Sequence, residues 1–145
     1  MLILWPMKFS RLFIILLAAY FLSNCANPGT SLSGGAKDEN PPVMLRSQPE
    51  NFTTNFAAEE VTIEFDEFLK PGNPAAKLII SPVMDKKPEV KIRGKNLLIK
   101  FSSELLPDRT YTLNFGDGIA DLNENNSIEN FTYVFSTGAE IDSLQ

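Results

Sequence analysis

The amino-acid sequence predicts an all-β protein whose main domain is an antiparallel sandwich of about seven short strands. Several segments alternate apolar and polar residues with the period of two that is typical of half-buried strands. Clusters of Gly, Pro, Asn and Asp separate these segments, as turns do. No segment of this part of the chain shows the apolar period of an amphipathic helix. A run of about 100 residues with this pattern is typical of a β-sandwich.

The first element is a segment with the features of a secretory leader. Residues 12–22 are uncharged and follow Lys8 and Arg11. As a helix they would span roughly 16 Å, about half the apolar thickness of a bilayer, which favours the h-region of a signal peptide over a membrane span. Residues 22–25, Leu-Ser-Asn-Cys, resemble a bacterial lipobox, in which a lipoprotein signal peptidase cuts before the Cys.

We therefore expect residues 1–24 to be a lipoprotein signal peptide and Cys25 to carry acyl chains such as palmitate. Three acyl chains, at about 0.8 kcal/mol per buried methylene, hold a protein on a membrane almost permanently, whereas one chain does not. The alternative is an ordinary signal peptide that is cut near an unrelated Cys.

Charge and composition exclude several classes of function. Loss of the two positive charges of the leader takes the net charge from −5 to −7, which argues against binding nucleic acid. The chain has one Cys and therefore no internal disulfide, and it has no His. Without His, the Ser-His-Asp and Cys-His types of catalysis and His-based zinc sites are excluded. We expect no enzymatic activity and no cofactor, with Ca²⁺ as a possible exception.

Residues 25–40 are predicted to be the lipidated Cys and a flexible tether, because they are rich in Gly, Ser and Asn. Fifteen such residues have a root-mean-square reach of roughly 20 Å. Pro41 and Pro42 end the tether stiffly. The sandwich is expected over residues 41–138, as a monomeric domain, and residues 139–145 form a tail or the start of a further module.

Alternation predicts the individual strands and the side chains that face the core. The strands are expected at residues 43–47, 60–65, 78–80, 89–92, 96–101, 110–115 and 131–135, with 89–101 forming a hairpin around Gly94. The inward side chains are Val61, Ile63, Phe65, Val90, Ile92, Leu97, Ile99, Phe101, Tyr111, Leu113, Phe115, Phe131, Tyr133 and Phe135. Tyr111 follows Leu-Leu-Pro-Asp-Arg-Thr, which favours a tyrosine corner over a merely half-buried aromatic residue.

Seven short motifs in this order resemble a known family. They are residues 34–38 (GGAKD), 47–51 (SQPEN), 63–68 (IEFDEF), 80–82 (ISP), 114–117 (NFGD), 121–124 (DLNE) and 135–138 (FSTG). Together they resemble the bacterial Ig-like (SbsA-type) domain at the N-terminus of lipoproteins common in Bacteroidota. The resemblance implies an Ig-like sandwich without known catalysis, located in the cell envelope as an outer-membrane lipoprotein that faces the periplasm or the cell surface.

One loop carries the oxygen-rich side chains that Ca²⁺ prefers. Residues 116–130 hold Asp117, Asp121, Asn123, Glu124 and Asn125. Among these, Asp121, Asn123 and Asn125 alternate as at the start of an EF-hand loop. However, Asn126 stands where that motif needs Gly, and Asn and Asp are also common in ordinary turns. Calcium binding is therefore the less favoured interpretation of this loop.

Two further candidates are weaker. Glu64, Asp66 and Glu67 could suggest the paired carboxylates of a glycosidase, but alternation places Glu64 and Asp66 on the outward face of a strand. Ser143, in Asp-Ser-Leu, resembles a short O-glycosylation signal used in the same bacterial group.

Two functions remain from different classes. The first is a non-enzymatic, lipid-anchored module that acts as a spacer, scaffold or adhesion and partner-binding unit in the envelope. The second is a glycan- or Ca²⁺-binding accessory module of a larger uptake or degradation system. The expected partners are the membrane, through Cys25, and an envelope protein or glycan.

Overall fold

The computed structural model describes residues 35–142, of which the part from residue 37 onward forms one compact unit. The strands are β1 (Met44–Gln48), β2 (Glu60–Phe65), β3 (Ile79–Ser81), β4 (Glu89–Arg93), β5 (Asn96–Lys100), β6 (Thr110–Asn114) and β7 (Thr132–Ser136). A short 3-10 helix, η1 (Pro74–Lys77), precedes β3. All seven predicted strands are confirmed to within one residue at each end.

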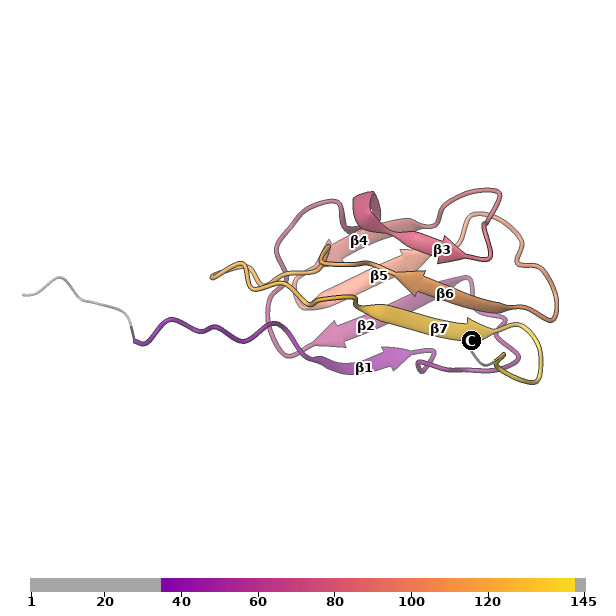
Figure 1. The fold of residues 1–145 in the computed structure, drawn as a ribbon, viewed down its shortest axis with the longest axis horizontal. Helices are drawn as coiled ribbons and strands as arrows, with labels where there is room; N and C mark the ends of the chain where they lie inside the picture. The colour runs from indigo at the N-terminus through magenta and orange to yellow at the C-terminus, as the bar shows by residue number, and fades with distance from the viewer. Residues whose placement is uncertain (1–34, 143–145) are drawn as a thin grey trace, which may run out of the picture. The chain divides into compact units, whose positions relative to one another are not determined.

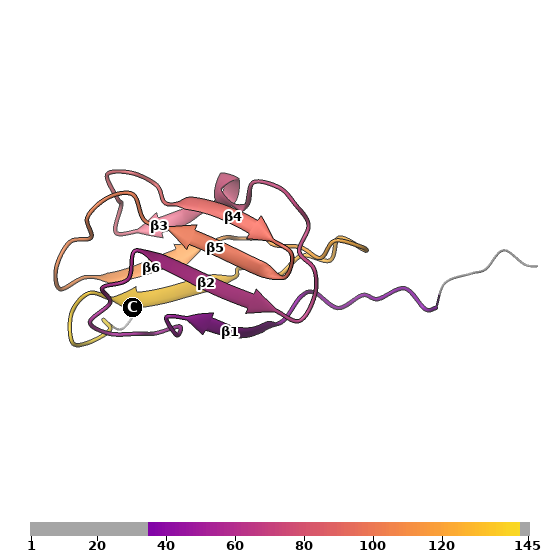
Figure 2. The same cartoon turned by 180° about the vertical axis from the view of Figure 1, so that it is seen from behind.

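The strands form two antiparallel sheets, with the orders β1-β2-β5-β4 and β3-β6-β7. Figure 1 shows the three-stranded sheet in front, and Figure 2 shows the four-stranded sheet from the other side. Numbered along the chain, these orders are those of a constant-type Ig sandwich. The predicted fold class is therefore confirmed. No helix among residues 35–142 has both the length and the apolar character needed to cross a bilayer.

The core lies between the sheets and is made largely of the predicted inward side chains. Those of β2, β5, β6 and β7 are fully buried, whereas Val90, Ile92, Phe101 and Phe131 are half-buried. Four core residues were not predicted to face inward, namely Phe56, Leu69, Leu78 and Ile119, and all four belong to connecting segments. The loops thus contribute apolar anchors that alternation cannot reveal.

Phe135 on β7 is the centre of an aromatic cluster. Its ring centroid lies 4.0 Å from that of Phe56, 5.3 Å from that of Tyr111 and 5.5 Å from that of Phe101. The ring of Tyr133 is 6.1 Å away. These spacings fall in or near the range that favours aromatic pairs beyond simple area burial.

An irregular segment, residues 51–56, covers the free edge of β7. The backbone N–H of Phe52 donates to Val134 O at 2.7 Å. The N–H of Asn55 donates to Gly138 O at 2.8 Å, and the N–H of Phe56 donates to Ser136 O at 2.9 Å. In return Ser136 N–H donates to Thr53 O at 2.8 Å, and Val134 N–H donates to Asn51 Oδ1 at 2.8 Å. The Thr53–Phe135 bridge is parallel. This segment keeps the edge of β7 from pairing with another chain.

The tyrosine corner is confirmed. The backbone N–H of Leu106 donates to the Tyr111 hydroxyl at 2.9 Å, which ties the β5–β6 connection to the start of β6. Thr137 secures the same corner, because its hydroxyl donates to Leu106 O at 2.7 Å.

We expect Tyr111→Phe to lower the free energy of unfolding by about 1 kcal/mol, because the Leu106 N–H loses its partner while the ring still packs. Urea denaturation followed by circular dichroism measures the change. An unchanged midpoint would show that water replaces the hydroxyl at no cost.

Candidate functional site

Three loops and the incoming chain meet at one end of the sandwich, which we call the proximal end (residues 38–43, 66–78, 94–95 and 116–131). Backbone hydrogen bonds join the loops. Leu69 N–H donates to Gly94 O at 2.9 Å, Lys70 N–H donates to Ala120 O at 2.8 Å, and Leu122 N–H donates to Phe68 O at 2.8 Å. In antibody variable domains the loops that correspond to β2–β3 and β6–β7 are recognition loops.

Asp121 is buried, whereas the other three predicted calcium ligands are exposed. Its carboxylate accepts the backbone N–H groups of Glu124 at 2.6 Å, Asn125 at 2.9 Å and Asn126 at 2.7 Å. Burial alone would raise the pKa of Asp121, but the hydrogen bonds to its charged form outweigh burial, so its pKa is lowered. Asp121 therefore acts as the internal brace of its loop.

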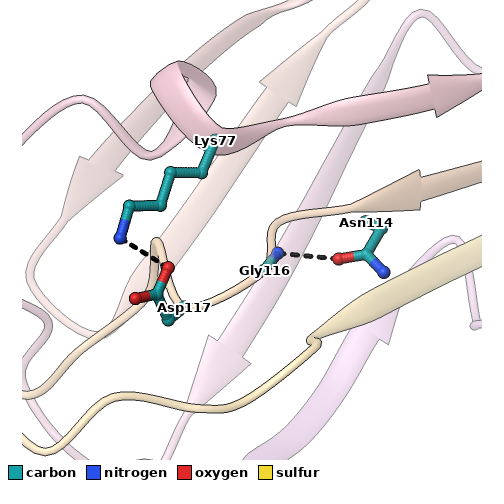
Figure 3. A network of polar contacts seen from close by, with 4 residues as sticks. All are labelled: Lys77, Asn114, Gly116 and Asp117. Carbon is teal, nitrogen blue, oxygen red and sulfur yellow. Dashed lines mark hydrogen bonds and ion pairs between the residues drawn. The ribbon is translucent and has the colours of Figure 1, made fainter.

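Asp117 is exposed and forms an ion pair with Lys77 of η1, as Figure 3 shows. This pair lowers the pKa of Asp117, mainly through the hydrogen bond from Lys77. Next to it, Gly116 N–H donates to Asn114 Oδ1 at 2.7 Å. Gly116 has φ +54°, a conformation that Gly adopts without the strain of a Cβ, so this turn directs Asp117 toward η1.

The remaining predicted ligands are placed differently again. Asn125 Oδ1 accepts a hydrogen bond from Lys70 Nζ at 2.7 Å, and Asn123 is exposed. Within residues 35–142, no three acidic side chains lie close enough together to hold a metal ion. Calcium binding stays a prediction, and side-chain oxygens of Asp117, Asp121 and Asn125 already accept hydrogen bonds from the protein.

An open depression of about 340 Å³ separates η1 from the loop after β6. Lys70, Lys77, Asn73, Asp117 and Ser127 are among the residues that line it. Both lysines are engaged, Lys70 with Asn125 and Lys77 with Asp117. The depression is thus polar, and both of its lysines already have partners within the protein. It is therefore better suited to contact with water than to binding a charged ligand.

The incoming chain is attached to the same loop. The Asn126 side-chain amide donates to the carbonyl oxygens of Asp38 at 3.0 Å and Asn40 at 3.1 Å. We expected residues 25–40 to be free tether, but the structure joins Asp38 and Asn40 to the domain. Cys25 and Ser143 lie outside the described residues.

Glu64 and Asp66 do not form a catalytic pair of the glycosidase type. Glu64 forms an ion pair with Arg46, and Asp66 is exposed, with its Oδ1 accepting the N–H of Val43 at 2.7 Å. Both carboxylates lie on the surface, as alternation predicted.

Sequence reasoning missed Asn126, which is the residue that links two distant parts of the chain. Its partners lie more than 80 residues away, so no local pattern could have shown the contact. The available signal was indirect, since Asn stands where an EF-hand loop requires Gly.

A comparison with known protein families agrees with this architecture. The family model described as "Bacterial Ig-like domain" matches residues 38–137. No curated protein sequence matches the chain. Among solved structures, it is similar to PcoC, a methionine-rich copper resistance protein from Escherichia coli, with 20% identity and a TM-score of 0.46 over 66% of this chain and 96% of PcoC. At that level of likeness nothing about copper follows for this chain.

Proposed function

Because this chain belongs to the family of bacterial Ig-like domains, we propose that it is a non-enzymatic envelope module held at a membrane by lipid on Cys25. It would serve there as a spacer, scaffold or partner-binding unit. Domains of this family are typically extracellular or envelope-associated, and the match indicates no enzymatic family. Our proposal includes its finer identity as an SbsA-type lipoprotein of the outer membrane in Bacteroidota.

The observation that carries the proposal is the position of Cys25, directly after a short apolar segment. The sandwich adds support. Its incoming chain reaches β1 at the proximal end, whereas β7 starts from the loop at that end and runs away from it. The chain therefore enters the domain at one end and leaves β7 at the other. An anchor on the N-terminal side would then lie at the opposite end from anything attached beyond β7.

The alternative, a calcium- or glycan-binding accessory module, gains less support from the geometry. Oxygen atoms of Asp121, Asp117 and Asn125 already accept hydrogen bonds from the protein. A ligand at this loop would have to replace those bonds, which weakens the case for a preformed site.

The lipid anchor can be tested by metabolic labelling of the full chain with an alkyne analogue of palmitate in a Gram-negative host. We expect the wild-type protein to be labelled and the Cys25→Ser variant to be unlabelled. Mass spectrometry should find an N-terminal peptide that starts at residue 25 and carries acyl chains. Labelling is the decisive measurement, because an uncut leader could hold the variant on a membrane by itself.

A mature wild-type protein with a free thiol at Cys25, or one that starts at another residue, would contradict the anchor. In that case the module would be secreted without lipid, and the alternative of an ordinary signal peptide would hold.

A further inference from the structure

We propose that the loop of residues 116–130 is a clamp that fixes the direction in which the N-terminal segment leaves the domain. The free tether would then end at Lys37 instead of Asn40. The clamp itself does not depend on lipid at Cys25, and only its use in orienting the domain at a membrane rests on the proposed function.

The side-chain amide of Asn126 binds the N-terminal segment. An Asn amide has two N–H donors, and here one nitrogen serves two acceptors, the carbonyl oxygens of Asp38 and Asn40. A single side chain thus holds two alternate residues of the incoming chain, which restrains its direction as well as its position.

Hydrogen bonds to Asp121 hold Asn126 itself in place. Asp121 accepts the N–H of Asn126 at 2.7 Å, and the Asp121 N–H donates to Asn126 O at 3.1 Å. Because Asp121 is buried, the loop backbone cannot shift without breaking bonds to a buried charge. Asp121 is therefore a positioning residue for the clamp.

The held segment is also stiffened from within. The Asp38 carboxylate accepts both the backbone N–H of Asn40 at 3.0 Å and its side-chain amide at 2.7 Å. Pro41 and Pro42 then fix two successive φ angles, and Pro42 is buried. Val43 closes the segment, because its N–H donates to Asp66 Oδ1 at 2.7 Å and its carbonyl oxygen accepts the N–H of Asp66 at 3.0 Å. Residues 38–43 thus form a strap fastened at both ends.

The test compares two substitutions in one loop with the same change of charge. Asn126→Asp keeps the size of the side chain but removes both donors, whereas Asn123→Asp makes the identical change at an exposed position. Backbone ¹⁵N relaxation is measured on the full, unlipidated chain in detergent micelles. We expect order parameters near 0.85 at residues 38–40 in the wild type and in Asn123→Asp, and values below about 0.6 in Asn126→Asp.

A second readout is the rate of tryptic cleavage after Lys37, which should rise several-fold in Asn126→Asp and stay unchanged in Asn123→Asp. Order parameters below about 0.6 at residues 38–40 of the wild type would overturn the clamp, and that measurement needs no variant. Equal order parameters in the wild type and Asn126→Asp would overturn it as well. The presence or absence of acylation at Cys25 affects neither result.

Discussion

Replacing Phe135 with alanine is expected to lower the free energy of unfolding by about 3–5 kcal/mol, the largest effect of any single substitution considered. Phe135 is fully buried between the sheets, and four aromatic rings pack around it. The substitution leaves a cavity that rings anchored on four different segments cannot fill by moving together. Urea denaturation monitored by circular dichroism gives the change directly.

Two companion variants make the result specific. Phe135→Leu keeps part of the volume and should lose less stability. Val83→Ala removes methyl groups from a side chain that is 86% exposed, so its effect should stay within about 0.5 kcal/mol. A loss below about 1 kcal/mol in Phe135→Ala would show that the core does not close around this ring.

Replacing Asp121 with asparagine is expected to cost about 3 kcal/mol. The carboxylate accepts three backbone N–H groups, and an amide in its place offers one acceptor oxygen and turns N–H donors toward those donors. Asp117→Asn is the matched control, because it removes the same charge from an exposed ion pair with Lys77. It should cost far less than Asp121→Asn does, because solvent screens the exposed pair. Equal losses in the two variants would contradict the role of Asp121 as an internal brace.

The same residue predicts a dependence of stability on pH. Folding lowers the pKa of Asp121, so its stabilising contribution is complete above the pKa of the unfolded chain, which is about 3.9. The contribution is lost as the pH falls below that value toward the pKa of the folded state. The wild type should therefore lose stability between neutral pH and pH 3 more steeply than Asp121→Asn does, as measured by thermal denaturation across that range. Parallel curves would exclude the effect.

The strands were predictable because each depends on a local pattern. In β2, Val61, Ile63 and Phe65 alternate with polar neighbours, and the same period identifies β5, β6 and β7. The tyrosine corner was predictable for a similar reason, since Tyr111 and its partner Leu106 are five residues apart. The sequence was sufficient to predict a feature wherever the residues that form it lie close together in the chain.

The proximal end was only partly predictable. The sequence shows that Asp117, Asp121, Asn123 and Asn125 share a loop, but it does not show which oxygen atoms turn inward. In the structure the Asp121 carboxylate accepts hydrogen bonds from the backbone of the loop, and Asp117 pairs with Lys77. Turn-forming Asn and Asp residues have the same composition as a calcium loop, so only the three-dimensional contacts separate the two.

Segment 51–56 could not have been predicted either, because its partner β7 lies about 80 residues away and the segment has no alternation of its own. The sequence shows only the turn residues that precede it. The η1 helix was missed because it has only four residues, starting at Pro74, and such a short sequence is equally compatible with a loop.

The parallel contact between segment 51–56 and β7 gives the domain a mechanical property. A pull on the two ends of the domain would draw segment 51–56 toward the proximal end and β7 the opposite way. Their hydrogen bonds, including Phe52 to Val134 and Thr53 to Ser136, would then be loaded together in shear instead of opening one at a time. A domain built in this way resists stretching best along the line from the point where the chain enters β1 to the end of β7.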